Sequence, residues 1–409
     1  MRSPGFGRLR RQPGYGAFFS AATLARLADE MFSVGVVLFL LDRTGSPELA
    51  GATVAAITLP SLVTGPLLGA WLDVTGRRRA LMVVDQLAIT ATLLGILVAT
   101  GSAPDILIPF IALFAGFTYP LSFGGFTSLI PALVPDELLD SANALEATSF
   151  NLALVIGPAL AGTLAAVLGP AAPLVVEAVL SLAVLPLLFV VPALDRPGVA
   201  RGDRGLGETV AEGLRQIVAV PQLRGVTVAG ALGLAGLGLL TVAFPLFAVE
   251  GLDAPRSSSG YMFAAFAVGS MAGALGLVRL QAIFPPDRVV VVGYAVFGAL
   301  MLLWPLAGTL ALLLVLIAVA GVADGPALTA QFAVRQRRVP RRLHGQVFTT
   351  AVSLKVGAFA AGAAVAGPVV VALGAAQTLL LAAAMQFAAA GIGYLLMRLP
   401  GRAGAASAS

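Results

Sequence analysis

The chain has 409 residues, of which 58% are hydrophobic and only 11% are charged, and its mean hydropathy is +0.96. A soluble chain would carry about 25% charged residues, so the composition excludes an ordinary soluble domain. Cysteine is absent and His344 is the only histidine, which excludes disulfides, thiolate metal sites and histidine metal clusters.

Apolar runs of about 20 residues recur along the chain, each long enough to cross a hydrocarbon core of about 30 Å. They predict an all-α integral membrane protein with twelve transmembrane helices. The predicted spans, in chain order, cover residues 17–41, 49–71, 80–100, 106–129, 141–168, 172–192, 224–248, 259–280, 288–306, 309–331, 346–371 and 377–397.

A polar stretch separates the sixth predicted span from the seventh. We therefore predict an N-terminal six-helix bundle at residues 1–191, a cytoplasmic linker at 192–222, and a C-terminal six-helix bundle with a short tail at 223–409. Within the linker, residues 208–220 are expected to form a short amphipathic helix on the inner membrane surface.

The distribution of arginine predicts the orientation. If both termini lie in the cytoplasm, the basic clusters at 77–79 and 335–342 fall on the inner side. The outer loops then receive only Arg43 and Arg256, beside several acids, as the positive-inside rule requires. This predicts a multi-pass protein of a bacterial inner membrane. The net charge of +5 faces anionic lipid headgroups, so no nucleic-acid partner is expected.

The chain also repeats itself at half its length. The sequence Gly-Pro-Ala-Leu-Ala-Gly at 157–162 recurs as Gly-Ala-Ala-Val-Ala-Gly at 362–367, a shift of 205 residues. This repeat predicts that the two six-helix bundles are duplicated units related by pseudo-symmetry about an axis along the membrane normal.

The loop between the second and third spans reads Gly69-x-x-x-Asp73-x-x-Gly76-Arg77-Arg78-Arg79. It is similar to the signature loop of the major facilitator superfamily, although Val74 stands where a basic residue is common. The resemblance implies a gating role in alternating access for Gly69, Asp73, Gly76 and Arg77. Arg77 and Arg78 could pair with inner-face acids, namely Asp85, Asp136 or Glu137. The alternative is that the loop only fixes topology through its charge.

Two further stretches resemble exporters of this superfamily. In the fifth span, Asn151 to Gly162, with Gly157 and Pro158, resembles the motif of carriers that exchange drugs for protons. The alternative for these small residues is close helix packing. The stretch from Arg26-x-x-Asp29 to Thr44-Gly-Ser-Pro47 looks like the branch of macrolide-efflux and siderophore-exporter-like carriers.

Charges inside the bilayer are the main candidates for function, because each costs roughly 2.5 kcal/mol or more unless it is paired or hydrated. In the first span, Arg26 can reach Asp29 at i,i+3 or Glu30 at i,i+4. One carboxylate is then in excess and could carry a coupling proton. Asp29 is the first choice, since Glu30 could instead face water. The alternative is a structural ion pair.

Other charged residues lie in predicted spans later in the chain. Glu177 is in the sixth span, and Asp324 precedes a Gly-Pro pair in the tenth. Lys355, in the eleventh span, could meet an anionic group of a substrate or pair with Asp324. Glu146, near the inner end of the fifth span, is expected to pair with loop arginines.

These features predict a secondary active exporter of small amphipathic molecules, drugs or siderophore-like compounds, that works by alternating access. The chain has no phosphate-binding loop for ATP, so the proton gradient is the expected energy source and no cofactor or metal is expected. The expected partners are a small-molecule substrate and the lipid bilayer, and the expected state is a monomer. The alternatives are an uptake symporter or facilitator on the same fold and a transport-inactive membrane sensor. An enzyme is not expected, because His344 alone cannot supply a catalytic cluster.

Overall fold

The computed structural model describes residues 4–65, 67–68, 77–121, 126, 130–191, 206–276, 283–339 and 344–400. Within these ranges all regular elements are helices, which confirms the all-α prediction. Twelve of the described helices occupy the predicted spans: α2 (Tyr15–Arg43), α3 (Pro47–Thr58), α5 (Arg78–Ala99), α6 (Leu107–Gly116), α8 (Leu139–Leu168), α9 (Ala172–Val190), α11 (Pro221–Leu252), α12 (Ser258–Gly276), α14 (Pro286–Met301), α15 (Leu310–Arg338), α16 (His344–Leu373) and α17 (Ala375–Arg398).

Ten of the spans in the described residues are long and apolar enough to cross a membrane by length and composition. The other two are α2, which is interrupted by Arg26, Asp29 and Glu30, and α6, whose described part is short. The linker contains α10 (Leu206–Ala219), which confirms the amphipathic helix predicted there. Two shorter helices, α1 (Pro4–Leu9) and α7 (Ile130–Leu133), lie beside α8.

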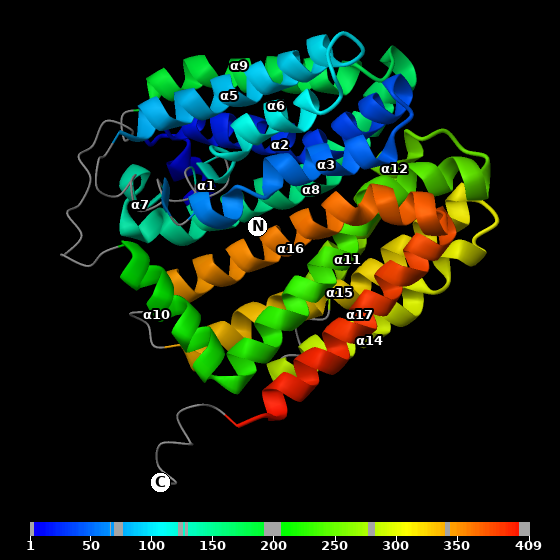
Figure 1. Ribbon diagram of the computed structural model, residues 1–409. Coiled ribbons are helices and arrows are strands. Elements are labelled where there is room, and N and C mark those ends of the chain that lie inside the picture. Colours follow the sequence, from blue (N-terminus) through cyan, green and yellow to red (C-terminus); the bar gives the residue numbers. More distant parts are fainter. Residues whose placement is uncertain are drawn as a thin grey trace.

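The helices form two groups in chain order (Figure 1). In the first half, defined as α2 to α9, α2 packs on α8 and α9, α5 on α9, and α3 on α6. In the second half, defined as α11 to α17, α11 packs on α16 and α17, and α15 on α12 and α14. The halves meet where α3 packs on α16 and where α8 packs on α12. The proposed domain boundaries at 191/192 and 222/223 stay predictions.

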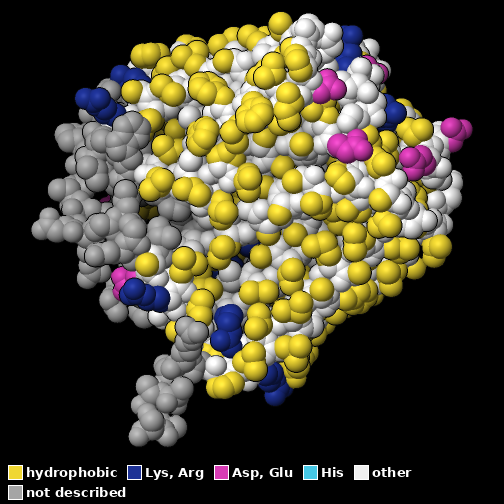
Figure 2. Space-filling view, in the orientation of Figure 1, with side chains coloured by type: hydrophobic (Ala, Val, Ile, Leu, Met, Phe, Trp, Pro, Cys, Tyr) yellow, Lys and Arg dark blue, Asp and Glu magenta, His cyan; other side chains and the backbone are white. Residues whose placement is uncertain are grey.

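Charged side chains mark two ends of the helix bundle. We call the end with α1, α10 and Arg335 to Arg338 the basic end, and the end with the α2–α3 and α11–α12 loops the acidic end. Figure 2 shows a broad hydrophobic surface between them, with most visible acids gathered at the right. This band is the surface expected of a chain that crosses a bilayer.

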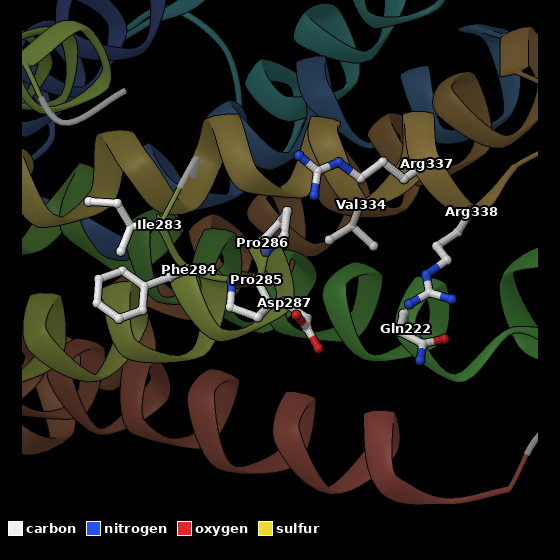
Figure 3. Close-up of a pocket in the computed structure, with 9 residues that line it drawn as sticks. All are labelled: Gln222, Ile283, Phe284, Pro285, Pro286, Asp287, Val334, Arg337 and Arg338. Atoms are coloured by element: carbon white, nitrogen blue, oxygen red, sulfur yellow. The ribbon is translucent and has the colours of Figure 1, made fainter. Parts of the chain in front are cut away.

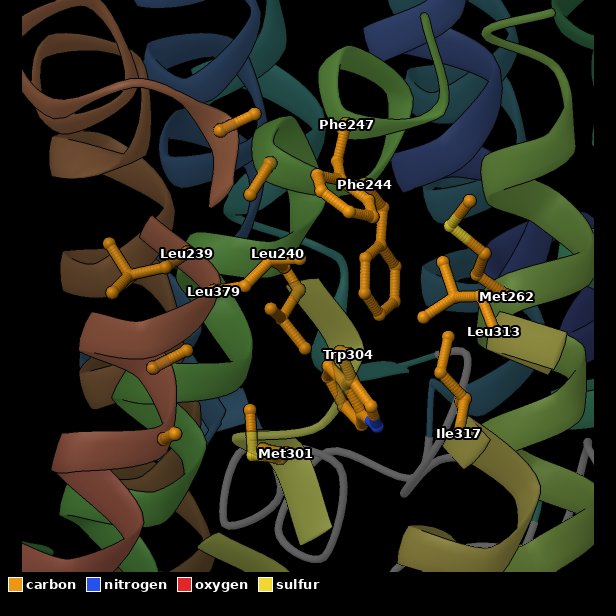
Figure 4. Packing of buried hydrophobic residues seen from close by; sticks show 14 of the residues in the cluster. Leu239, Leu240, Phe244, Phe247, Met262, Met301, Trp304, Leu313, Ile317 and Leu379 are labelled. Carbon is orange, nitrogen blue, oxygen red and sulfur yellow. The ribbon is translucent and has the colours of Figure 1, made fainter. Parts of the chain in front are cut away.

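Aromatic side chains fill the second half near the acidic end (Figure 4). Phe244 of α11 lies with its ring centroid 5.7 Å from that of Trp304 and 5.0 Å from that of Phe263. Phe244 and Phe247 are almost fully buried. These aromatics therefore pack the core of the second half.

Glycines let the two halves approach closely. A Cβ at Gly367 of α16 would run into the backbone of Glu48 at the start of α3, and a Cβ at Gly51 would run into the carbonyl of Ala363. Small residues of this kind permit close packing of membrane helices, where dispersion rather than water drives association. Arg256 adds a cross-half hydrogen bond, donating to the Leu41 carbonyl at 2.8 Å. These contacts close the acidic end.

Candidate functional site

In the first half, a buried arginine joins α2 to α8. Arg26 is 1% exposed, and its NH1 donates to the Ser149 hydroxyl at 2.8 Å. Its NH2 forms an ion pair with the Glu146 carboxylate. Glu146 was expected to pair with loop arginines, whereas its described ion pair is with Arg26 of α2. The ion-pair partner described for Arg26 lies in α8 rather than in its own helix. The packing of α2 on α8 places this partner, which spacing within one helix does not reveal.

Beside this pair lies a cluster of carboxyl groups from three helices. Asp29 of α2 is 5% exposed and Glu177 of α9 is 1% exposed, and the two interact electrostatically. Tyr119, just after α6, lies within electrostatic range of both, as well as of Glu30 and of Asp85 in α5. The structure thus brings Asp29, Glu30 and Glu177 together. Their proximity could not be predicted from the sequence, where they were three separate candidates. We call Asp29, Glu30, Asp85 and Glu177 the acid cluster.

The antiporter-like stretch of α8 contacts both the acid cluster and the other half. Gly157 lies directly against Glu30, so that an added Cβ would come within 2.6 Å of the Glu30 Cβ. One turn later, Gly162 and the Pro158 carbonyl pack against Gly260 of α12. These small residues therefore do pack closely, as the packing alternative requires. Asn151 of the same stretch is exposed.

Close to the Gly162 contact, a direct hydrogen bond joins the halves. The hydroxyls of Thr163 in α8 and Tyr261 in α12 lie 2.8 Å apart. Thus α8 carries the partner of Arg26, the neighbour of Glu30 and the cross-half contact on one continuous helix. Pro158 lies inside this helix, between Glu146 and the cross-half contact at Gly162.

The second half contains a different polar network. Lys355 of α16 donates to the Gln331 side-chain oxygen at 3.4 Å, and the Gln331 amide donates to the Tyr294 hydroxyl at 3.1 Å. Asp324 accepts a hydrogen bond from Ser270 at 3.1 Å. Lys355 and Asp324 interact electrostatically, but within the described part of the chain the lysine is hydrogen-bonded to Gln331 rather than paired with the acid.

The network is accommodated by glycines of α11. An added Cβ at Gly230 would lie 2.6 Å from the Gln331 oxygen and 3.2 Å from Cδ of Lys355. A Cβ at Gly233 would meet the Tyr294 ring. The α11 backbone therefore forms one wall of the network, and larger residues here would displace its polar side chains.

Several members of these clusters were not predicted from the sequence. Arg335, expected in a loop, lies within α15 and is 1% exposed. Gln331 and Gln386 are buried as well, and Gln386 donates to the Gly233 carbonyl at 3.0 Å. The signal was present in the sequence, because Gln331 and Arg335 are polar residues one helical turn apart at the end of an apolar span.

The signature loop lies largely outside the described residues, including Gly69, Asp73 and Gly76. Arg77 is exposed and Arg78 begins α5. The neighbouring Arg79 donates to the Val191 carbonyl at 3.2 Å, and its guanidinium lies over the Phe189 ring. Arg79 therefore ties the start of α5 to the end of α9, whereas the gating role of Arg77 and Arg78 stays a prediction.

Comparison with known proteins gives a consistent result along the whole chain. Residues 6–409 match the family described as transmembrane secretion effector. The chain is 32% identical over 385 residues to the MFS-type (major facilitator superfamily) transporter y4rN of Sinorhizobium fredii, covering 90% of this chain and 91% of the relative. It is 29% identical over 411 residues to the multidrug efflux pump Tap of Mycobacterium tuberculosis, covering 95% and 94%.

Solved transporter structures share the fold at low sequence identity. The nucleoside transporter NupG superposes with a TM-score of 0.72 at 13% identity, covering 93% of this chain and 98% of that one. A bacterial homologue of the iron transporter ferroportin, in an inward-facing state, gives a TM-score of 0.71 at 16% identity, covering 94% and 98%.

Proposed function

Because the chain belongs to the transmembrane secretion effector family of major facilitator superfamily transporters, we propose that it is a proton-coupled exporter of small amphipathic molecules. It is a transporter rather than an enzyme. The name of the relative Tap, a multidrug efflux pump, supports export of such compounds. The acid cluster carries the proposal of proton coupling, because it gathers buried carboxyl groups from three helices at one place.

The electrostatics of the acid cluster favour a proton as coupling ion. In the described residues, Arg26 is the one fully buried cation of the first half, and it is paired with Glu146. Asp29 and Glu177 share a low-dielectric site with two further acids, Glu30 and Asp85, in electrostatic range of the same Tyr119. Carboxyl groups gathered at one site repel one another when all are ionised, so a proton on one of them relieves that repulsion. If a bound substrate displaces this proton, transport of the substrate is coupled to movement of the proton.

We infer that α8 transmits this change to the interface. Protonation at Asp29 or Glu30 alters how α2 seats against α8, where Gly157 contacts Glu30. The same helix meets α12 through Gly162 and Gly260 at the acidic end. Rocking of α8 with the first half would separate this contact and open the acidic end, as expected of alternating access between two rigid groups of helices.

The second half is proposed to bind the substrate. Lys355, Gln331 and Tyr294 offer a cation, an amide and a hydroxyl from three helices, and Asp324 adds an acid nearby. A few polar groups set in apolar surroundings are typical of sites for small organic ligands. We further propose that the protein works as a monomer in a bacterial inner membrane with both termini in the cytoplasm, using the proton gradient and no cofactor.

Substrate-induced proton movement in proteoliposomes tests the proposal. Wild type, Asp29→Asn and Glu177→Gln are compared across a panel of cationic, neutral and anionic amphiphiles. Asp105→Asn is the matched control, because Asp105 is an exposed acid at the acidic end. We expect one class of compound to move protons with wild type and Asp105→Asn, and the movement to be lost in both cluster variants.

The other outcomes separate the alternatives. Compound accumulation in the same direction as the proton indicates an uptake symporter, and transport without proton movement indicates a facilitator. Binding without either transport or exchange indicates a sensor. Each of these three results contradicts proton-coupled export.

A further inference from the structure

A pocket of about 460 Å³ lies at the basic end of the second half, where α14 begins and α15 ends. Figure 3 shows Arg337 and Arg338 of α15 on one side of this pocket, with Asp287 of α14 and Gln222 of α11 across from them. Both arginines are exposed. The described contacts assign neither guanidinium an ion-pair partner within the protein. The pocket is large enough for a headgroup-sized ligand.

An apolar groove begins beside this pocket and shares Phe284 with it. Its volume is about 510 Å³, and it runs between α14 and α15. Gly293 lies at the groove, where an added Cβ would come within 2.7 Å of the Ala327 Cβ, so the two helices approach closely behind it. The walls consist of valines that stay exposed, namely Val292, Val296 and Val319.

The groove has the length of one membrane leaflet. On α14 its lining runs from Arg288 to Leu300. Twelve helical steps of about 1.5 Å give roughly 18 Å. Half of a hydrocarbon core of about 30 Å is roughly 15 Å, which an acyl chain of a phospholipid spans. A groove of this length, opening at the level of a charged pocket, fits one chain of a lipid in the leaflet at the basic end.

The charges select the headgroup. Arg337 and Arg338 line the pocket and Arg288 lines the mouth of the groove, whereas Asp287 is the one acid among the described residues that line either. The excess of two positive charges complements an anionic headgroup, because basic pockets between transmembrane helices at the membrane surface attract phosphate groups. We propose that this is a binding site for an anionic phospholipid, with its phosphate at Arg337 and Arg338 and one acyl chain in the α14–α15 groove.

Such a lipid would touch the helix that carries the polar network. Ala323 and Pro326 line the groove and flank Asp324 and Gly325 in α15. An acyl chain seated there would stabilise α15 against α14 at the level of Asp324. The lipid would therefore support the second half from its membrane side, independently of any substrate or coupling ion.

The test measures the phospholipid retained by the full-length protein in detergent, by native mass spectrometry, after addition of phosphatidylglycerol or phosphatidylcholine. Wild type is expected to retain phosphatidylglycerol in preference. In Arg337→Gln/Arg338→Gln, the loss of two cations is expected to weaken that binding roughly thirtyfold. Arg398→Gln is the matched control, because Arg398 is an exposed arginine at the same end but outside the pocket.

A second variant tests the groove without changing charge. Val296→Trp should fill it and lower phosphatidylglycerol retention, whereas Val179→Trp, at an exposed valine of α9, should not. The proposal would be overturned if wild type and both site variants retained the same amount of phosphatidylglycerol. It would also be overturned if Arg398→Gln lost as much phosphatidylglycerol binding as Arg337→Gln/Arg338→Gln. Preference for phosphatidylcholine would show that the charges do not select the lipid. If the arginine variant does not fold, Val296→Trp alone decides between these outcomes.

Discussion

In the first half, the buried charged groups are mainly carboxyls, held by α2, α5, α8 and α9 around one arginine. In the polar network of the second half, as far as its residues are described, an amide, a phenol and two cations, Lys355 and Arg335, accompany one acid, Asp324. Both halves use six spans in the same order along the chain, so this difference is not imposed by the architecture. On the proposed function, one unit handles protons and the other holds polar groups of a substrate.

Breaking the Arg26–Glu146 ion pair of the first half is expected to have the largest effect on stability. Arg26→Ala leaves Glu146 buried without its cation, so we expect a loss of about 3–5 kcal/mol in stability. Replacing both partners in Arg26→Leu/Glu146→Leu should recover much of it, because no buried charge is left uncompensated. Thermal unfolding in detergent measures the cycle. Arg215→Ala, at an exposed arginine of α10, is the control. A double variant as unstable as Arg26→Ala would contradict the pairing.

Substitution of Gly230, which lies in α11 against the polar network of the second half, is expected to have the next largest effect on stability. In Gly230→Ala the new methyl group meets Gln331 and Lys355, and we expect a cost of about 1–3 kcal/mol from overpacking. Gly391→Ala in α17 is the matched control, since a Cβ added there would meet nothing within 4 Å, and alanine should be neutral or stabilising by about 0.4–1 kcal/mol. If the two variants give the same unfolding curve, the α11 glycines do not confine the network.

Removing the Tyr294 hydroxyl tests the hydrogen bond that joins this residue to Gln331 in the same network. Tyr294→Phe deletes the acceptor of the Gln331 amide, and we expect a loss of about 0.5–1.5 kcal/mol together with weaker substrate binding. Tyr394→Phe changes the same residue type at an exposed site of α17 and should change neither. Substrate titration and thermal unfolding are measured on both variants. Unchanged binding in Tyr294→Phe would remove the tyrosine from the substrate site.

The smallest expected effect concerns the contact between halves. Thr163→Val removes the hydrogen bond to Tyr261, which in membrane proteins is worth about 0.6 kcal/mol on average. We expect the acidic end to open more often, by a factor of about three. Because the chain contains no cysteine, spin labels can be placed directly through Arg43→Cys and Glu250→Cys, one in each half. Identical distance distributions with and without Thr163→Val would show that this bond does not hold the acidic end closed.

The spans, the linker helix and the presence of Asp29 and Glu177 within spans could be predicted from the sequence, because apolar runs and rare charges within them are local signals. It did not allow the partners to be predicted. Glu146 lies 120 positions from Arg26, and only the packing of α2 on α8 joins them. Arg335 was misplaced because a basic residue next to a cluster resembles a loop, whereas α15 extends to Arg338.

The division of labour between the halves is tested most directly by comparing gradient-driven transport with substrate exchange in the same proteoliposomes. We predict that Asp29→Asn/Glu177→Gln retains exchange but loses gradient-driven transport, because the substrate groups remain while the proton site is gone. Lys355→Gln should instead weaken both by weakening substrate binding. Full gradient-driven transport by Asp29→Asn/Glu177→Gln would contradict the assignment of proton coupling to the first half.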